Sequence, residues 1–438
     1  MRRTLTLALT ALAVAGGVAP LAAAQVTLPR VRGVQVGSPP QAVPPSQGTP
    51  AAAPGGAAGP LPAGDAPGGG SFSTISGRPP EPPARRVEPR IWEISFESNI
   101  ASPITPDRTT PALTVPQVNF WMPLVLQSTY SVIDPSSVRT EVSIDGRLKP
   151  LPPEAIQFRQ GLSQGMSAVG FGLRNVSAQG LKWLVRWRVQ CWSSVVDEAA
   201  AAAATWPTEW PEDARGSLQA EPGVEAGHPD MKAFVDRVSR GNLRSVTPWI
   251  AAKELVRATI TSYRGVDATG TRIENGFTRG VVFNGALSSL RAGTGSSHDL
   301  VAACVAVLRT ADIPARIVLG AAEVLNSSGT STPTRLVSWG ELWLPGAGWV
   351  PFDPNELRSS IRGGLSLERP WKRFGTWDGL NECIPLCYGW SLAMPGFHSL
   401  PYPAGFVWSL APGQVDLTMM KDRVIMQILS RGRGRESR

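Results

Sequence analysis

The run from Gly295 to Pro354 constrains the fold of this chain more than any other segment. Small residues, Gly295-Ser296-Ser297, lead into apolar positions at helical spacing, and this helix is expected to end at Asp312-Ile313-Pro314. Strand-like runs follow, and Pro345-Gly346-Ala347-Gly348 reads as the turn of a hairpin. The strands are expected near residues 316–319, 335–344 and 349–353. A helix followed by antiparallel strands predicts an α+β unit.

Four short motifs within this run resemble the transglutaminase-like core, a papain-like family. They are Gly295-Ser296-Ser297, Ile313-Pro314-Ala315-Arg316, Ser338-Trp339-Gly340-Glu341 and Gly348 to Pro354. In that family a Gly-x-Cys turn opens a helix that ends in Gly-Ile-Pro-Ala-Arg. A His precedes x-Trp-x-Glu on a strand, and an Asp precedes Pro on the next strand. The resemblance covers residues 225–357 and implies a papain-like fold with an α lobe and a β lobe.

The same resemblance places the three catalytic positions of the family. Counting back from Ile313 puts the nucleophile at Ser297, and counting back from Trp339 puts the histidine at Val337. The aspartate falls at Asp353. Because a hydroxyl is far harder to ionise than a thiol, Ser297 would need a general base that Val337 cannot supply. The resemblance therefore implies a family member that is catalytically degenerate, with Ser296 or Ser297 capping the helix and Asp299 in its first turn.

Two histidines could restore a base to the site. His298 follows Ser297 directly, but adjacent helical residues point about 100° apart, so its ring is not expected to face the hydroxyl. His398 lies after the core and could fold back over the cleft. His228 reads as a loop residue. The alternative function is thus an active acyltransferase, peptidase or amidase that uses Ser297 with a histidine from elsewhere.

Four cysteines fit an oxidising compartment without requiring disulfides. Cys383 and Cys387 are close enough in sequence for a disulfide that closes a small loop. Cys191 continues an alternating apolar face and should point into the core. Cys304 lies seven residues beyond Ser297, about 10 Å further along the helix and on nearly the same face, so it is expected to be a core residue rather than a nucleophile.

The N-terminus reads as an export signal at residues 1–24, with a basic start, an apolar core and Ala22-Ala23-Ala24 before Gln25. Later windows are interrupted by charge or proline, so no transmembrane helix is expected in the mature chain. Export to the periplasm or cell surface follows. The formal charge is +8, partly from a basic tail at residues 431–438. No nucleic-acid-binding motif accompanies it.

Composition divides the rest of the chain. Residues 25–89 form a Pro-, Gly- and Ala-rich spacer, which predicts disorder. Residues 90–197 alternate in strand fashion, with a hairpin turn at Asp145-Gly146, and predict an antiparallel β-sandwich. Residues 358–430 form an aromatic-rich extension, expected to wrap irregularly over the core or to offer an aromatic platform for carbohydrate or peptide. The fold class is α+β, a β-sandwich followed by a transglutaminase-like core.

The function expected from the sequence is non-catalytic binding or scaffolding at the cell envelope. The ligand class would be an extended peptide or an envelope polymer. No cofactor and no metal site is predicted, and the sequence does not define the oligomeric state.

Overall fold

The structure is a computed structural model that describes most residues after the spacer. The described residues are 82–101, 113–151, 155–267, 270–274, 277–322, 335–360, 364–390, 407–410 and 421–433. The predicted signal at residues 1–24 and the predicted histidine partner His398 lie outside them. In the part described, no helix is both long enough and apolar enough to cross a membrane.

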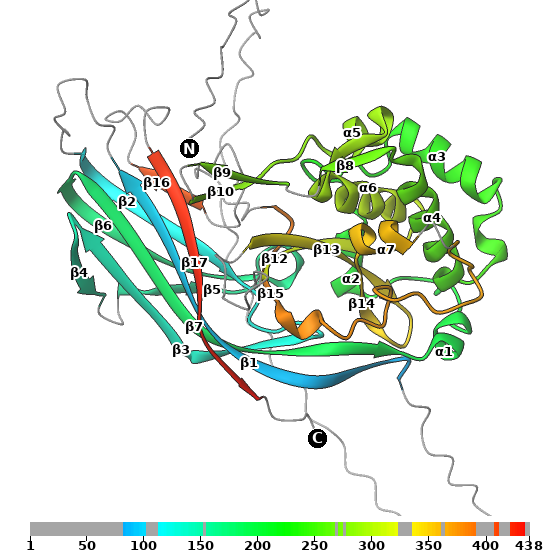
Figure 1. Ribbon diagram of the computed structural model, residues 1–438, viewed down its shortest axis with the longest axis horizontal. Helices are drawn as coiled ribbons and strands as arrows, with labels where there is room; N and C mark the ends of the chain where they lie inside the picture. Colours follow the sequence, from blue (N-terminus) through cyan, green and yellow to red (C-terminus); the bar gives the residue numbers. More distant parts are fainter. Residues whose placement is uncertain are drawn as a thin grey trace, which may run out of the picture. The chain divides into compact units, whose positions relative to one another are not determined.

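Long antiparallel strands build the first part of the fold (Figure 1). One sheet has the order β4-β3-β7-β1-β17-β10-β9, and another has the order β16-β2-β6-β5. The strands of the first sheet are β1 (Ala84–Ala101), β3 (Ser131–Ile144), β4 (Arg147–Pro150), β7 (Gly180–Val196), β9 (Thr271–Glu274), β10 (Phe277–Val281) and β17 (Lys421–Arg433). Those of the second are β2 (Leu113–Leu124), β5 (Gln157–Arg159), β6 (Ser167–Ala178) and β16 (Val407–Leu410).

Aromatic side chains join these two sheets face to face. Trp183 of β7 stacks on Phe120 of β2, with ring centroids 4.7 Å apart, and lies 6.0 Å from Phe171 of β6. The predicted hairpin turn is confirmed, because Asp145 and Gly146 connect β3 to β4 with φ angles of 48° and 81°. Positive φ at both central residues matches the right-handed twist of paired strands.

The strand bounds differ from the predicted ones at both ends of the chain. β1 begins at Ala84, within the predicted spacer at residues 25–89, because Ala84 pairs with Val196 of β7. At the other end, β17 runs to Arg433, into the predicted basic tail, and pairs along β1. The first sheet therefore recruits a strand from the predicted extension at residues 358–430, a pairing that no local sequence pattern indicates.

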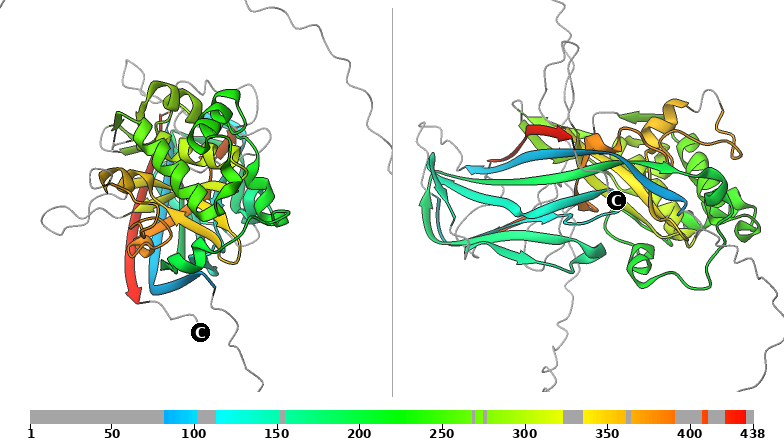
Figure 2. Two further views of the ribbon diagram at one scale, coloured as in Figure 1. Left: turned by 90° about the vertical axis from the view of Figure 1, so that its right-hand side faces the viewer. Right: turned by 90° about the horizontal axis from the view of Figure 1, so that it is seen from below.

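A second unit, with helices on a smaller antiparallel sheet, follows β7 in the chain. Its sheet has the order β14-β13-β12-β15, and a short parallel pair joins β8 to β11. Figure 2 shows the helices gathered beside this sheet, while β1 and β7 run past it. The strands are β8 (Gly265–Asp267), β11 (Thr294–Ser296), β12 (Ala315–Ala322), β13 (Arg335–Leu344), β14 (Gly348–Phe352) and β15 (Cys383–Tyr388). The helices are α1 (Glu198–Ala202), α2 (Glu212–Arg215), α3 (Pro229–Ser239), α4 (Pro248–Ser262), α5 (Ala286–Ala292), α6 (Ser297–Thr310) and α7 (Pro354–Ser360).

Helix α6 is the centre of this second unit. Every residue from His298 to Arg309 is buried, because α3, α4, α5 and α7 surround the helix and β13 lies against it. The helix ends where Asp312 takes a left-handed φ of 59° before Ile313-Pro314. Its buried position fixes the direction in which its N-terminus, at Ser297, points.

The described part of the aromatic extension up to Trp390 contributes to the core rather than forming an exposed platform. Trp371, Phe374, Trp377 and Trp390 are each at most 6% exposed, and β15 completes the edge of the smaller sheet. This corrects the prediction of an irregular extension, because β15 pairs with β12.

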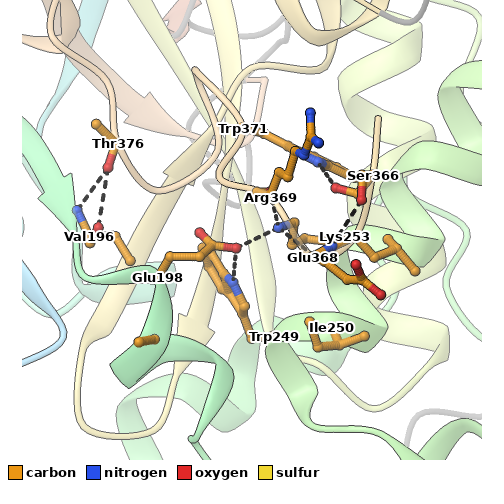
Figure 3. A network of polar contacts seen from close by, with 12 residues as sticks. Val196, Glu198, Trp249, Ile250, Lys253, Ser366, Glu368, Arg369, Trp371 and Thr376 are labelled. Carbon is orange, nitrogen blue, oxygen red and sulfur yellow. Dashed lines mark hydrogen bonds and ion pairs between the residues drawn. The ribbon is translucent and has the colours of Figure 1, made fainter. Parts of the chain in front are cut away.

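A buried polar network ties α1, α4 and the extension together (Figure 3). The Lys253 ammonium, which is fully buried, donates to the Glu198 carboxylate, to the Leu367 carbonyl at 2.9 Å and to the Arg369 carbonyl at 2.7 Å. Trp249 Nε1 also donates to Glu198. All three ammonium protons thus have acceptors, which a buried charge requires.

Candidate functional site

The N-terminus of α6 is fixed by its own polar side chains. Ser296 is the N-cap, its hydroxyl accepts the Asp299 backbone N–H at 3.1 Å, and the Asp299 carboxylate accepts the Ser296 N–H at 2.8 Å. Asp299 also accepts the backbone N–H groups of Asn284 and Gly285. This capping box satisfies orphan donors of the first turn. Because Ser296 serves as the cap, the hydroxyl of Ser297, the first helical residue, is not needed for that role.

One cavity borders all three predicted family positions. It measures about 330 Å³ and is referred to below as the Ser297 cleft. Its position follows from the pairing of β13 with β14, in which Gly340 lies opposite Phe352. Trp339 and Asp353, the residues adjacent to this pair, therefore lie close to each other, as the sequence predicted. The cleft is lined by Val266, Ser297, Arg335, Leu336, Val337, Ser338, Asp353, Asn355, Glu356 and Arg358.

Asp353 caps helix α7. Its Oδ1 accepts the backbone N–H of Asn355 at 3.0 Å and that of Glu356 at 3.4 Å. Burial raises the pKa of the Asp353 carboxyl to about 6, against the weaker lowering effect of these two hydrogen bonds. Asn355 in turn donates from Nδ2 to the Ser297 carbonyl at 3.2 Å. The carboxylate is therefore held by its own helix, with Asn355 linking that helix to α6.

The His298 ring lies buried behind the cleft and is only 1% exposed. Its Nδ1 shares a hydrogen bond of 2.7 Å with Ser338 Oγ, and its edge packs against the Trp390 ring. Its Nε2 is buried and has no hydrogen-bond partner among the residues that the structure describes. Burial lowers the pKa of this imidazole to about 4, so the ring is neutral near pH 7.

The Ser297 hydroxyl and His298 Nε2 both lie close to Gly270. A Cβ placed on Gly270 would lie 2.5 Å from Ser297 Oγ and 3.0 Å from His298 Nε2. Gly270 also has a φ of +41°, which side-chain-bearing residues rarely adopt. The His298 imidazole thus forms its hydrogen bond with Ser338 rather than with Ser297. The Ser297 hydroxyl and His298 Nε2 nevertheless both lie next to Gly270.

Sequence reasoning missed Gly270, Ser338 and Asn355. Ser338 adjoins Val337, the predicted histidine position, and Asn355 follows Asp353-Pro354, so adjacency to those predicted positions was the available signal. The third histidine, His228, is the N-cap of α3 and accepts the Asp230 N–H at Nδ1.

Two of the four cysteines were predicted to be core residues, and the burial of their side chains tests this. Cys304 is 0% exposed and Cys191 is 1% exposed, which confirms both as core residues, and burial raises the pKa of each thiol. The predicted Cys383–Cys387 disulfide is not formed in the structure, where these two residues lie four positions apart on the extended strand β15. Four residues of strand span about 13 Å, well beyond the roughly 7 Å that bridged Cα atoms tolerate.

A second, larger cavity lies among the long strands. It measures about 880 Å³ and is bordered by residues of β3, β5 and β7. It contains none of the three family positions, and for that reason the Ser297 cleft is the candidate site.

Part of this chain is similar to known proteins. The family model described as "Transglutaminase-like superfamily" matches residues 262–354, and no curated protein matches the chain. Among solved structures, the chain is similar to a candidate cysteine protease from Cytophaga hutchinsonii, with 12% identity over 79% of this chain and 93% of that one and a TM-score of 0.46. It is also similar to the periplasmic domain of TgpA from Pseudomonas aeruginosa, with 18% identity over 64% of this chain and 93% of that one and a TM-score of 0.30. Residues 262–354 of this chain thus belong to the transglutaminase-like superfamily.

Proposed function

We propose that this chain is an exported binding protein whose transglutaminase-like domain keeps the family cleft without its thiol chemistry. One observation carries the proposal: a single cavity is bordered by Ser297, Val337 and Asp353. At the nucleophile position of the family the cavity has a hydroxyl, and at the base position it has an isopropyl group.

The remaining polar groups do not replace that chemistry. Asp353 is committed to capping α7, since its Oδ1 accepts the backbone N–H groups of Asn355 and Glu356. Cys304 is fully buried, so a substrate in the cleft does not reach its sulfur.

The ligand class proposed is an extended peptide or a similar linear polymer. β14 pairs with residues 340–344 of β13, so in the part of the chain that the structure describes residues 335–339 have no β14 partner. This stretch lies beside the cleft, where an extended chain can add to a strand edge through backbone hydrogen bonds. Arg335, Arg358 and Glu356 add charges of both signs, which suits a polar chain.

Binding is tested with the purified full chain and a fluorescent, extended peptide that contains Gln and Lys. Val337→Arg fills the cleft and should weaken binding at least about tenfold, which corresponds to 1.4 kcal/mol. The matched control is Val132→Arg, at a position 36% exposed on β3 that does not line the cleft. Equal affinity of the two variants would refute binding in the cleft.

Catalysis is tested in the same preparation by ammonia release from the Gln peptide and by peptide cleavage. No turnover that depends on Ser297 is expected. Turnover that disappears in Ser297→Ala would overturn the non-catalytic proposal while leaving the cleft as the site.

The assignment of family positions is tested by restoring them. Ser297→Cys combined with Val337→His should react with iodoacetamide faster than Ser297→Cys alone, because a nearby imidazole stabilises the thiolate. Equal rates at neutral pH would contradict the placement of Val337 opposite Ser297.

A second candidate function is a serine acyl hydrolase that uses His298 as base. The observation in its favour is that Ser338 orients the His298 ring, while Nε2, which has no partner among the described residues, borders Gly270 together with Ser297 Oγ. In this reaction the Ser297 oxygen would bond to the acyl carbon while its proton passes to Nε2. The bond from the acyl carbon to the leaving group would then break as Nε2 returns the proton to that group, and water would hydrolyse the acyl-serine to release the acid and restore the hydroxyl. A fluorophosphonate probe would then label Ser297 in the wild type and not in His298→Gln. Absence of labelling in the wild type would reject this candidate.

A further inference from the structure

The segment that leads into β15 lies along the start of β1 and the end of β7 (Figure 1). Trp377 exchanges backbone hydrogen bonds with Ser194, at 2.8 and 3.3 Å. Trp92 Nε1 donates to the Asn381 carbonyl at 2.7 Å, and Asn381 Nδ2 donates to the Glu88 carbonyl at 2.6 Å. Residues 377–383 therefore form a seam, called here the β1–β7 seam, between the long strands and the smaller sheet.

Cys191 faces this seam from β7, as its two neighbours across the sheet indicate. On β1 its register partner is Arg90, which forms an ion pair of 2.6 Å with Glu382. On β3 its register partner is Ser131, which lines a small cavity together with Cys383. Side chains directly opposite each other in an antiparallel pair lie on one face of the sheet. Cys191 thus lies between one residue that contacts Glu382 and another that borders the cavity of Cys383.

The electrostatics of the two thiols agree with this placement. Burial raises the pKa of Cys191, and the neighbouring Cys383 thiol raises it further. The other two thiols lie in other surroundings. Cys304 is a buried residue of helix α6, and Cys387 Sγ donates to the Gly389 carbonyl at 3.4 Å.

We propose that Cys191 and Cys383 form a disulfide across the β1–β7 seam when the chain folds in an oxidising environment. The two thiols lose two protons and two electrons, the S–S bond forms, and an oxidised dithiol carrier or oxidised glutathione is reduced to its thiols. The bond joins β7 to the start of β15, so it closes the loop that runs from residue 191 to residue 383. A disulfide that closes so long a loop strongly restricts the unfolded chain.

The timing of this oxidation follows from burial. The pKa of Cys383 is raised to about 12 by burial, so the folded, reduced protein carries very little thiolate at neutral pH. Thiolate is the species that attacks a disulfide. The bond is therefore expected to form during folding, before the seam closes, and slowly or not at all in the folded reduced protein.

The experiment refolds the full chain from the denatured, reduced state in a glutathione redox buffer, then quenches the thiols with acid. After non-reducing digestion with trypsin, mass spectrometry should find the peptide with Cys191 linked to the peptide that holds both Cys383 and Cys387. Variants resolve that ambiguity: the link should persist in Cys387→Ser and disappear in Cys383→Ser. Thiol titration of the oxidised chain in denaturant should count two free thiols of the four cysteines.

A stability measurement supplies a second readout. Oxidation should raise the thermal midpoint by on the order of 5 °C in the wild type and in Cys387→Ser, and by nothing in Cys191→Ser. Four free thiols after oxidative refolding, or a link that survives in Cys383→Ser, would overturn the proposal. If Cys191→Ser fails to fold, loss of the link and of the shift in Cys383→Ser decides the question.

Discussion

The Ser297 cleft and the Lys253 network are both polar sites at helices of the same unit, and they differ in how completely their groups are paired. Around Lys253 every ammonium proton has an acceptor, and Glu198 also receives Trp249. Beside the Ser297 cleft, His298 Nε2 and Asn355 Oδ1 are buried and find no hydrogen-bond partner within the described part of the chain. A buried polar group without a partner costs free energy. The difference indicates that the Lys253 network serves the architecture, whereas the cleft retains groups that a ligand can satisfy.

The largest expected effect is at Lys253. Lys253→Met keeps the apolar length of the side chain but leaves Glu198 and two carbonyls without their donor, and should lower the free energy of unfolding by about 3 kcal/mol. Chemical denaturation measures this. The control is Lys232→Met on the exposed face of α3. Equal midpoints for the two variants would show that the network contributes little to stability.

The pH dependence of stability should separate the two titrating groups beside the cleft. The folded pKa of His298, about 4, is below its ordinary 6.5, so the unfolded chain binds more protons and stability falls as pH drops from 6.5 through 4. The folded pKa of Asp353, about 6, is above its ordinary 3.8, so its contribution is present at low pH and is lost as pH rises through 6. Between about pH 4 and 6 the two effects oppose each other.

Asp353→Asn removes one of these effects and keeps an oxygen that can cap α7. Its free energy of unfolding should therefore rise with pH between 4 and 6.5, by up to about 1.4 kcal/mol per pH unit, more steeply than that of the wild type. Urea denaturation at several pH values measures the slope. Parallel profiles for the two proteins would contradict the raised pKa of Asp353.

A smaller effect is expected at Cys304, which belongs to the apolar interior of α6 rather than to either polar site. Cys304→Ala should cost about 1 to 2 kcal/mol through lost packing. In the folded protein its thiol should resist iodoacetamide and become reactive only on unfolding. Rapid labelling of Cys304 under native conditions would mean that the cleft reaches further along the helix than the structure indicates.

The sequence determined the features that depend on neighbours along the chain. The cap of α6, the Asp145-Gly146 turn, the hairpin that sets Trp339 near Asp353 and the burial of Cys304 all follow from spacing within one helix or one hairpin. The motifs that predict family positions at Ser297, Val337 and Asp353 are also short and contiguous, and these three residues border one cavity.

Only the tertiary structure decided which distant residues meet. The His298 ring bonds Ser338 on another element, and Gly270 borders both Ser297 and His298. β17 joins β1, and Ser131, the register partner of Cys191, borders the same small cavity as Cys383. The physical reason is that strand pairing and side-chain packing between remote segments depend on complementary shape and on where each backbone hydrogen bond finds its partner. A local sequence pattern does not determine which strands pair, because one strand with alternating apolar residues can pair with many others.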